Sequence, residues 1–325
     1  MIEGFSFTPY RRAFTQPLRT ARGIWAFREG FLVQYSDGGQ RYLGEVAPLP
    51  AFGSESLQQA AEFLTEATKN GVDPLRLQSL PACAFALSAV KPQHAAETHY
   101  PVAGLLPAGA AALSILSSKI KEGFTRFKWK IGVEAVSDEI EHFLRMLAVS
   151  PDRVRFRLDA NAALSCAKLE TWLQALSAHR HRIEFMEQPL AIGMEESMAD
   201  AMQQFGIAIA LDESLTYANY RERIHTWLGP LVIKPALMGT VSEQARVLAP
   251  VASRVVLSSA FESRLAIRMI IALAQSFPHL GYALGFDTAT AFQDSLAFQV
   301  ERANLVNQPL SAAEAQEIWD GWRVK

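Results

Sequence analysis

Residues 125–131 read TRFKWKI and residues 154–159 read VRFRLD, so each segment is a short apolar strand that carries an ionisable side chain near its end. The pattern recurs along the rest of the chain. Short buried strands that alternate with helices are typical of βαβ units and of a parallel sheet. The other strand candidates lie at 102–106, 183–187, 207–212, 231–234, 254–259 and 282–286. Eight such units predict an α/β protein built on a closed (β/α)₈ barrel. A doubly wound open sheet is the alternative, but no G-x-G-x-x-G motif follows any strand.

The segments between these strands have apolar residues three and four positions apart, which predicts helices packed on the sheet. They cover residues 138–147, 168–178, 195–205, 220–227, 242–251 and 265–275. The first 98 residues differ, because their apolar residues alternate around 5–8, 30–35 and 41–46, as in antiparallel strands with a turn at Asp37-Gly38. Helices are expected over 56–70 and 81–90, and a polar linker at 91–101. We therefore predict a small α+β domain over 1–98 and a barrel over 99–294, with the segment of about 295–325 as a candidate to return to the first domain.

The charge of the chain indicates which classes of molecule it can bind. The chain has 31 Lys and Arg against 33 Asp and Glu, a net charge of −2, and no basic block. This argues against nucleic acid or an anionic membrane and favours a small-molecule ligand without an obligate protein partner. Two cysteines cannot form a disulfide framework. The N-terminus lacks an apolar stretch of signal-peptide length, and prolines and glycines interrupt the longest uncharged run, so a cytoplasmic protein is expected.

Five predicted strands end in a charged residue: Lys130, Asp159, Glu187, Asp212 and Lys234. These residues follow one another at intervals of 29, 28, 25 and 22 residues, and each interval is about one βα unit. In a barrel the C-terminal strand ends surround one mouth, where active sites lie. We therefore expect the five side chains to converge on one pocket.

Three carboxylates from neighbouring strands are suitable ligands for a hard divalent cation. Because no His or Cys lies among Asp159, Glu187 and Asp212, the pattern indicates Mg²⁺, with Mn²⁺ as a substitute. A strand-end cap or a surface salt bridge is the alternative for any one of them. The lysines Lys130 and Lys234 flank this trio. A lysine buried near a cation has a lowered pKa and can act as a base, and Lys128, on the same strand face as Lys130, would add to this effect.

The order Lys-x-Lys, Asp, Glu, Asp, Lys at successive strand ends resembles the enolase superfamily, in which an α+β capping domain precedes a modified barrel. The matching segments are Lys128-Trp-Lys130, Asp159-Ala-Asn161, Glu187-Gln-Pro189, Asp212-Glu-Ser214 and Lys234-Pro235. Within its lysine-base, muconate-lactonising-enzyme-like branch, the chain is most similar to the o-succinylbenzoate synthase family of menaquinone and phylloquinone biosynthesis. The segments that indicate this family are REG at 28–30, GEVAPLPAFGSE at 44–55, SSAFES at 258–263 and GFDT at 285–288.

The resemblance implies a Mg²⁺-dependent lyase that dehydrates 2-succinyl-6-hydroxy-2,4-cyclohexadiene-1-carboxylate to 2-succinylbenzoate. Lys130 would take the α-proton and return it to the departing hydroxyl on the same face, and Lys234 would stabilise the intermediate as a cation. Related N-acylamino acid racemases and dipeptide epimerases share these barrel residues and form the alternative. A non-catalytic binding protein is a third reading, but it predicts a missing catalytic group.

Further residues are assigned around this core by the same resemblance. Ser259 and the Gly285 N–H are expected to bind the succinyl carboxylate. Arg157 is a candidate for substrate binding or for orienting ligands, and a buried structural partner is its equal alternative. Asn161 and Glu213 are expected to orient ligands or lysines. Residues 52–54 (Phe, Gly, Ser) lie on a loop expected to close over the pocket and exclude water.

Overall fold

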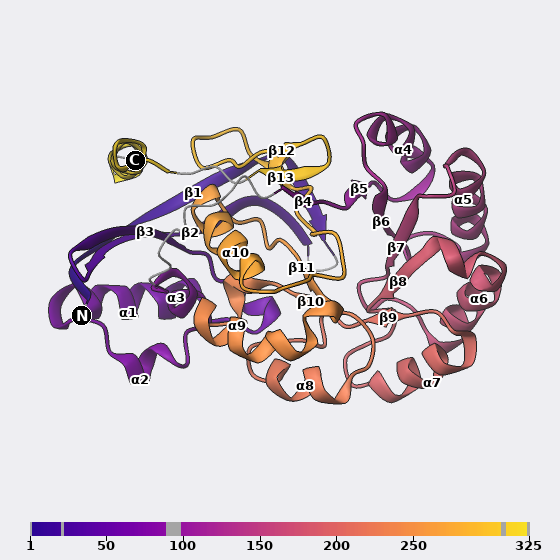
Figure 1. The fold of residues 1–325 in the computed structure, drawn as a ribbon, viewed down its shortest axis with the longest axis horizontal. Coiled ribbons are helices and arrows are strands. Elements are labelled where there is room, and N and C mark those ends of the chain that lie inside the picture. Colours follow the sequence, from indigo (N-terminus) through magenta and orange to yellow (C-terminus); the bar gives the residue numbers. More distant parts are fainter. Residues whose placement is uncertain (1, 21–22, 89–98, 307–309, 324–325) are drawn as a thin grey trace.

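The computed structural model describes residues 2–20, 23–88, 99–306 and 310–323 (Figure 1). An antiparallel sheet with three helices forms one end of the molecule, and a ring of parallel strands with outer helices forms the rest. The segment 89–98, which contains most of the predicted linker and the predicted domain boundary, lies outside the described residues. No helix in the described ranges is long and apolar enough to cross a membrane.

The barrel is confirmed, and its strands are short. Five of them form one parallel sheet: β5 (Gly104–Leu106), β6 (Arg126–Lys130), β7 (Arg155–Asp159), β8 (Ile183–Glu187) and β9 (Ile209–Ala210). Two more, β10 (Leu231–Ile233) and β11 (Val255–Leu257), form a parallel pair.

Single bridges close the ring between these two sheets. Leu211 bridges to Leu231 and so joins β9 to β10. On the other side, Leu284 bridges to Val102 and Gly285 bridges to Ser258. The strand predicted over 282–286 is therefore wrong as a full strand, because it shares only one bridge with each neighbour. Its backbone still completes the circuit, since the Leu284 N–H donates to Pro101 O and the Gly285 N–H to Leu257 O.

Every predicted barrel helix is present, and an additional helix follows β5. The helices are α4 (Ala112–Lys121), α5 (Val136–Val149), α6 (Cys166–Leu176), α7 (Glu195–Phe205), α8 (Tyr220–Thr226), α9 (Val241–Leu248) and α10 (Arg264–Gln275). Side-chain oxygens of Ser165, Thr240 and Ser263 cap the N-termini of α6, α9 and α10. The helices predicted over 168–178 and 242–251 end two or three residues early, because the chain tightens into 3₁₀ turns at Ser177–Arg182 and Ala249–Arg254.

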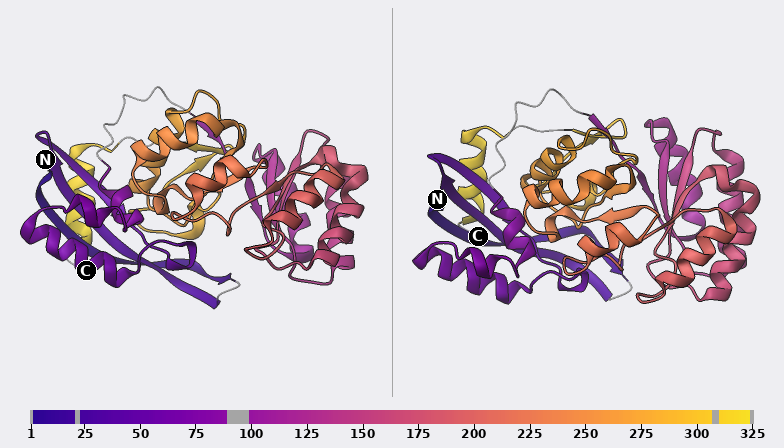
Figure 2. Two further views of the ribbon diagram at one scale, coloured as in Figure 1. Left: turned by 90° about the horizontal axis from the view of Figure 1, so that it is seen from below. Right: turned by 60° about the horizontal axis from the view of Figure 1, so that its bottom comes forward.

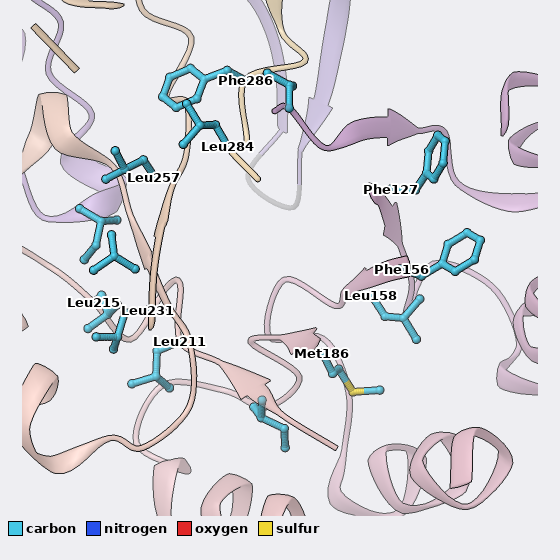
Figure 3. Packing of buried hydrophobic residues seen from close by; sticks show 14 of the residues in the cluster. Phe127, Phe156, Leu158, Met186, Leu211, Leu215, Leu231, Leu257, Leu284 and Phe286 are labelled. Atoms are coloured by element: carbon cyan, nitrogen blue, oxygen red, sulfur yellow. The ribbon is translucent and has the colours of Figure 1, made fainter. Parts of the chain in front are cut away.

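The strand alternation decides which side chains enter the barrel. In β6, Phe127 and Trp129 are fully buried in the main hydrophobic cluster, and Trp129 lies against Phe143 of α5 and Trp172 of α6. Figure 3 shows Phe127, Leu158 and Met186 on one side of the ring and Leu231 and Leu257 on the other, all directed away from its centre. Since successive strand side chains point to opposite faces, Lys128 and Lys130 point inward.

The N-terminal unit has three antiparallel strands: β1 (Ile2–Thr20), β2 (Gly23–Asp37) and β3 (Gln40–Val46). The turn predicted at Asp37-Gly38 is confirmed, since Asp37 pairs with Gln40. Beneath the sheet lie α1 (Leu57–Asn70), α2 (Pro74–Leu77) and α3 (Pro81–Ala86). The helix predicted over 81–90 thus ends at Ala86.

The last helix of the described chain returns to this unit, whereas the two strands before it stay with the barrel, where Ala303 and Leu305 join the main hydrophobic cluster. β4 (His99–Pro101) pairs with β13 (Asn304–Val306), which pairs with β12 (Val300–Glu301). The final helix, α11 (Ala312–Arg323), lies beside β1 in every view, far from α5 and α6 (Figures 1 and 2). Its Trp322 packs edge-on against Tyr10, with ring centroids 6.1 Å apart.

Candidate active site

The parallel register aligns the charged strand ends in one row. Lys130 is the direct neighbour of Asp159, and Asp159 is the direct neighbour of Glu187. Asp212 follows the Leu211–Leu231 bridge, and Lys234 follows β10. The five residues at the predicted strand ends therefore surround one mouth of the barrel, with the two lysines on either side of the carboxylates.

The three carboxylates are buried and bonded to lysines. Lys128 Nζ lies 2.8 Å from Asp159 Oδ2 and 2.7 Å from Glu187 Oε1, and so bridges the ends of β7 and β8. Lys234 forms an ion pair with Asp212. Glu187 is only 2% exposed. By contrast, Lys130 makes no hydrogen bond or ion pair within the described residues, so its amine is available to a bound molecule.

Glu213 adds a fourth carboxylate beside these three. One of its oxygens accepts a hydrogen bond from Asn161 Nδ2 at 3.2 Å, and the other is buried without a partner among the described residues. Burial, with the neighbouring charge of Asp159, raises the pKa of Glu213 to about 7. The Asn161 N–H donates to Asp159 Oδ1 at 3.0 Å. Asn161 and Glu213 thus lie in contact with the predicted ligand set.

Burial also shifts the pKa values of the other charged groups. It raises the pKa of Glu187, and Lys128 offsets this only in part. It lowers the pKa of Lys234 to about 7. Burial would lower the pKa of Lys128 as well, but the charges of Asp159 and Glu187 outweigh it and raise the pKa above its ordinary value. Burial is therefore the largest single cause that acts on the pKa of each of these three groups.

The donor chemistry of this mouth fits a hard divalent cation. In the described part of the chain, no three Asp, Glu, His or Cys side chains are grouped closely enough to hold a metal ion as they stand. Ammonium groups of Lys128 and Lys234 contact the three carboxylates instead. A group of buried carboxylates, in which one Glu213 oxygen lacks a partner in the described ranges, still favours an additional cation. Carboxylate oxygens are the ligands that Mg²⁺ prefers.

The loop at 47–54 lies against the mouth from the N-terminal unit. The Phe52 ring covers Lys234 Nζ at 4.4 Å from its centroid. At Gly53, φ is +81° and a Cβ would lie 2.8 Å from Thr216 Cβ, so only glycine fits between this loop and the segment after β9. The Leu49 N–H donates to Ser54 Oγ at 2.7 Å and closes the turn.

The residues expected to bind the substrate have partners inside the protein. The Gly285 N–H donates to Leu257 O at 2.8 Å, as part of barrel closure. Ser259 Oγ donates to Glu262 Oε2 at 2.7 Å and accepts from the Phe261 N–H and from Thr288 Oγ1. A hydroxyl has one proton and two lone pairs, so this group is saturated. Both groups thus have partners within the protein, and their contacts with a substrate carboxylate stay a prediction.

Arg157 lies two residues before Asp159, deeper in the barrel. Its guanidinium pairs with Glu184 at 2.5 Å and donates to Ala283 O at 2.8 Å, so the structure gives it the partners of a buried structural residue.

Two further polar residues support the mouth and were not assigned from the sequence. Arg28 donates to the carbonyls of Ala47 and Pro48 and to Ala260 O, and so ties the loop to the end of β11. Glu45 accepts hydrogen bonds from the N–H and hydroxyl of Ser263 at 2.7 and 2.8 Å. Their only sequence signals are the REG and GEV segments, which do not show what they contact.

Two family models match the chain. One, described as "Enolase C-terminal domain-like", covers residues 113–304, and another, described as "MenC, N-terminal domain", covers residues 18–93. An o-succinylbenzoate synthase from Thermosynechococcus vestitus is 34% identical over 297 residues, which are 85% of this chain and 90% of that protein. The chain belongs to the o-succinylbenzoate synthase family of the enolase superfamily. A second member, from Aliivibrio salmonicida, is 32% identical over 90% of this chain and 92% of its own.

Solved structures agree with this membership. The crystal structure of o-succinylbenzoate synthase from Thermosynechococcus elongatus, complexed with Mg in the active site, has a TM-score of 0.84 and 29% identity, and covers 98% of this chain and 99% of its own. The L-Ala-D/L-Glu epimerase of Bacillus subtilis has a TM-score of 0.75 over 95% of this chain and 96% of its own, but only 16% identity. This epimerase therefore shares the fold of the chain.

Proposed function

We propose that this chain is a magnesium-dependent o-succinylbenzoate synthase. It would dehydrate 2-succinyl-6-hydroxy-2,4-cyclohexadiene-1-carboxylate to 2-succinylbenzoate. The observation that carries the proposal is the Lys130 amine, which has no partner among the described residues and lies beside a buried row of carboxylates with Lys234 at its far side. Family membership over most of the chain supports the choice of this reaction.

Lys130 is the proposed base and acid. Its Nζ takes the α-proton, and the electron pair of the broken C–H bond moves onto the carboxylate that is attached to the ring. The C–O bond then breaks, and the same Nζ returns the proton to the departing hydroxyl, which leaves as water while the ring becomes aromatic. One lysine can do both tasks only if proton and hydroxyl leave from the same face, so a syn elimination follows.

Asp159, Glu187 and Asp212 are the proposed ligands of the cation, and Mn²⁺ is expected to substitute for Mg²⁺. When bound there, the cation supplies charge stabilisation for the electron-rich carboxylate that forms as the proton leaves. Lys128, bonded to Asp159 and Glu187, holds these two side chains in place.

Lys234 is proposed to face the ring of the intermediate as a cation, without transferring a proton. Phe52 lies over its ammonium group, so the loop from the N-terminal unit shields this side of the mouth from water. Asn161 and Glu213 orient Asp159 through the bonds described above. Arg157, Ser259 and Gly285 are assigned structural roles, because their polar groups are already bonded within the barrel.

A substrate assay tests this proposal. Purified protein with Mg²⁺ is expected to remove the cyclohexadiene absorbance rapidly, compared with the slow decay in buffer alone. An N-acylamino acid racemase or dipeptide epimerase is the alternative within the superfamily, and it would use Lys234 as a second base; the lowered pKa of Lys234 is the observation that favours it. Absence of decay, together with α-deuterium exchange of N-acylamino acids or dipeptides in D₂O, would replace the synthase with this alternative.

A further inference from the structure

Gln188 lies directly after Glu187 and is fully buried. Its φ is +35°, so the chain turns sharply there and the side chain reaches across to the next strand end. Oε1 accepts hydrogen bonds from the N–H groups of Asp212 and Ser214, at 3.0 and 3.1 Å. Nε2 donates to Leu190 O at 3.0 Å and to Ser214 Oγ at 2.9 Å. Both lone pairs and both protons of the amide are therefore used.

The backbone of Gln188 joins the neighbouring strand ends as well. Its N–H donates to Ala210 O at 2.9 Å, and its carbonyl accepts from the Ala162 N–H at 2.7 Å. Ala162 follows the Asp159 strand end, and Ala210 precedes Asp212. A single residue thus contacts the segments that carry all three proposed ligands.

The amide is anchored further out by a second buried contact. Ser214 Oγ, which accepts from Gln188, donates to Glu195 Oε1 at 2.5 Å at the start of α7. Glu195 also lies 3.4 Å from Arg223 of α8. Contacts with α7 and α8, in addition to those of its own strand, therefore fix the turn that carries Asp212.

We infer that Gln188 is a positioning residue for the divalent cation. Its amide fixes the backbone of residues 212–214, so that the Asp212 carboxylate is directed to the same place as Asp159 and Glu187. The inference rests on the proposed cation site. Loss of the amide would leave two buried N–H groups without acceptors, and the ligand turn would relax to find new ones. Groups that orient metal ligands typically change metal affinity by about 10–100-fold when they are removed.

Gln244 provides a matched control in the same barrel. It too is a fully buried glutamine, and its Nε2 donates to Pro235 O at 2.9 Å and to Gly239 O at 2.8 Å. It therefore supports the turn after β10, which carries none of the three proposed ligands. Replacement of either glutamine by methionine removes a buried amide of the same size.

The test measures Mg²⁺ binding to the metal-free, full-length wild type and to each variant by calorimetry. Mn²⁺ binding, followed by electron paramagnetic resonance, is a second measurement. Gln188→Met is expected to weaken cation binding by about 10–100-fold. Gln244→Met should bind within about twofold of the wild type, although both variants lose stability to urea in EDTA. Wild-type affinity in Gln188→Met, or equal weakening in both variants, would overturn the inference.

Two further outcomes keep the test decisive. If Gln188→Met does not fold, Ser214→Ala takes its place, because it removes the Gln188–Ser214 side-chain bond and the Glu195 anchor but keeps the Asp212 N–H bond. A severalfold loss of Mg²⁺ affinity in Ser214→Ala supports the positioning role, and unchanged affinity contradicts it. If the wild-type chain itself binds no Mg²⁺, the proposed cation site fails, and the positioning role fails with it.

Discussion

The barrel mouth has two halves that treat buried charge in opposite ways. The ligand half comprises the ends of β7, β8 and β9, where Asp159, Glu187, Asp212 and Glu213 crowd together and one Glu213 oxygen has no partner among the described residues. The closing half comprises residues 258–263 and 284–288. There Glu262 is just as buried, but both of its oxygens accept the Ala260 N–H at 2.8 Å.

This difference separates carboxylates that can bind a cation from carboxylates that stabilise the fold. A buried carboxylate without enough donors is costly unless a cation joins it. A buried carboxylate that accepts a hydrogen bond from a backbone N–H supplies the acceptor that this N–H lacks in the local chain. Changes in the ligand half should therefore alter cation binding and turnover, and changes in the closing half should alter stability.

Removal of the cation should have the largest effect. Treatment with EDTA is expected to lower turnover of the cyclohexadiene substrate by more than about 10³-fold, because charge stabilisation by a bound cation contributes several kcal/mol. Added Mg²⁺ should restore the activity. The measurement is the initial rate at several Mg²⁺ concentrations. Full activity in EDTA would contradict the assignment of the carboxylates of the ligand half to cation binding.

Lys130→Ala should lower kcat by about 10²–10⁴-fold, the usual contribution of a general base. Cation binding should stay at the wild-type level, because Lys130 contacts none of the carboxylates, whereas Lys128 and Lys234 do. The matched control is Lys168→Ala, since Lys168 is exposed on α6. Steady-state kinetics and Mg²⁺ calorimetry measure the two quantities. A variant that lost both together would indicate a structural role for Lys130.

The residues of the ligand half were predictable from the sequence because each is a charged residue at the end of an otherwise apolar strand. A charged residue at the end of an apolar strand, repeated at intervals of one βα unit, identified Lys130, Asp159, Glu187, Asp212 and Lys234 without any knowledge of contacts. The barrel followed from the same periodicity. Each signal is local in the chain, and the topology of a barrel converts it into proximity.

The closing half was not predictable, because its polar groups are satisfied by partners far away in the chain. The sequence does not show that Ser259 bonds Glu262, Phe261 and Thr288, or that the Gly285 N–H bonds Leu257. The predicted substrate contacts of Ser259 and Gly285 stay a prediction. No spacing rule shows that Glu45 accepts from Ser263, or that a single bridge on each side replaces the eighth strand. Such bonds depend on the final packing of the two units.

Glu45→Gln should reduce stability more than it changes chemistry. Glu45 accepts hydrogen bonds from Tyr10 Oη and from the N–H and hydroxyl of Ser263, and loss of its charge weakens all three. We expect the free energy of unfolding to fall by about 1.5–3 kcal/mol, as for hydrogen bonds to charged groups. Urea denaturation measures this. The control is Glu29→Gln, whose exposed pairing with Arg11 should contribute less than about 1 kcal/mol. Equal losses in the two variants would contradict the structural role of Glu45.

Ser259→Ala should have the smallest effect and gives the sharpest test of the closing half. Its hydroxyl already bonds Glu262, Phe261 and Thr288, so the variant is expected to lose about 1 kcal/mol of stability. Its KM should stay within about threefold of the wild type, because a hydroxyl that already donates its proton cannot also donate it to a substrate carboxylate. A direct hydrogen bond to that charged group would contribute about 1.5–3 kcal/mol to substrate binding. Steady-state kinetics distinguish the two cases. A tenfold rise in KM with unchanged kcat would mean that Ser259 exchanges these partners for the substrate, so that both halves of the mouth bind it.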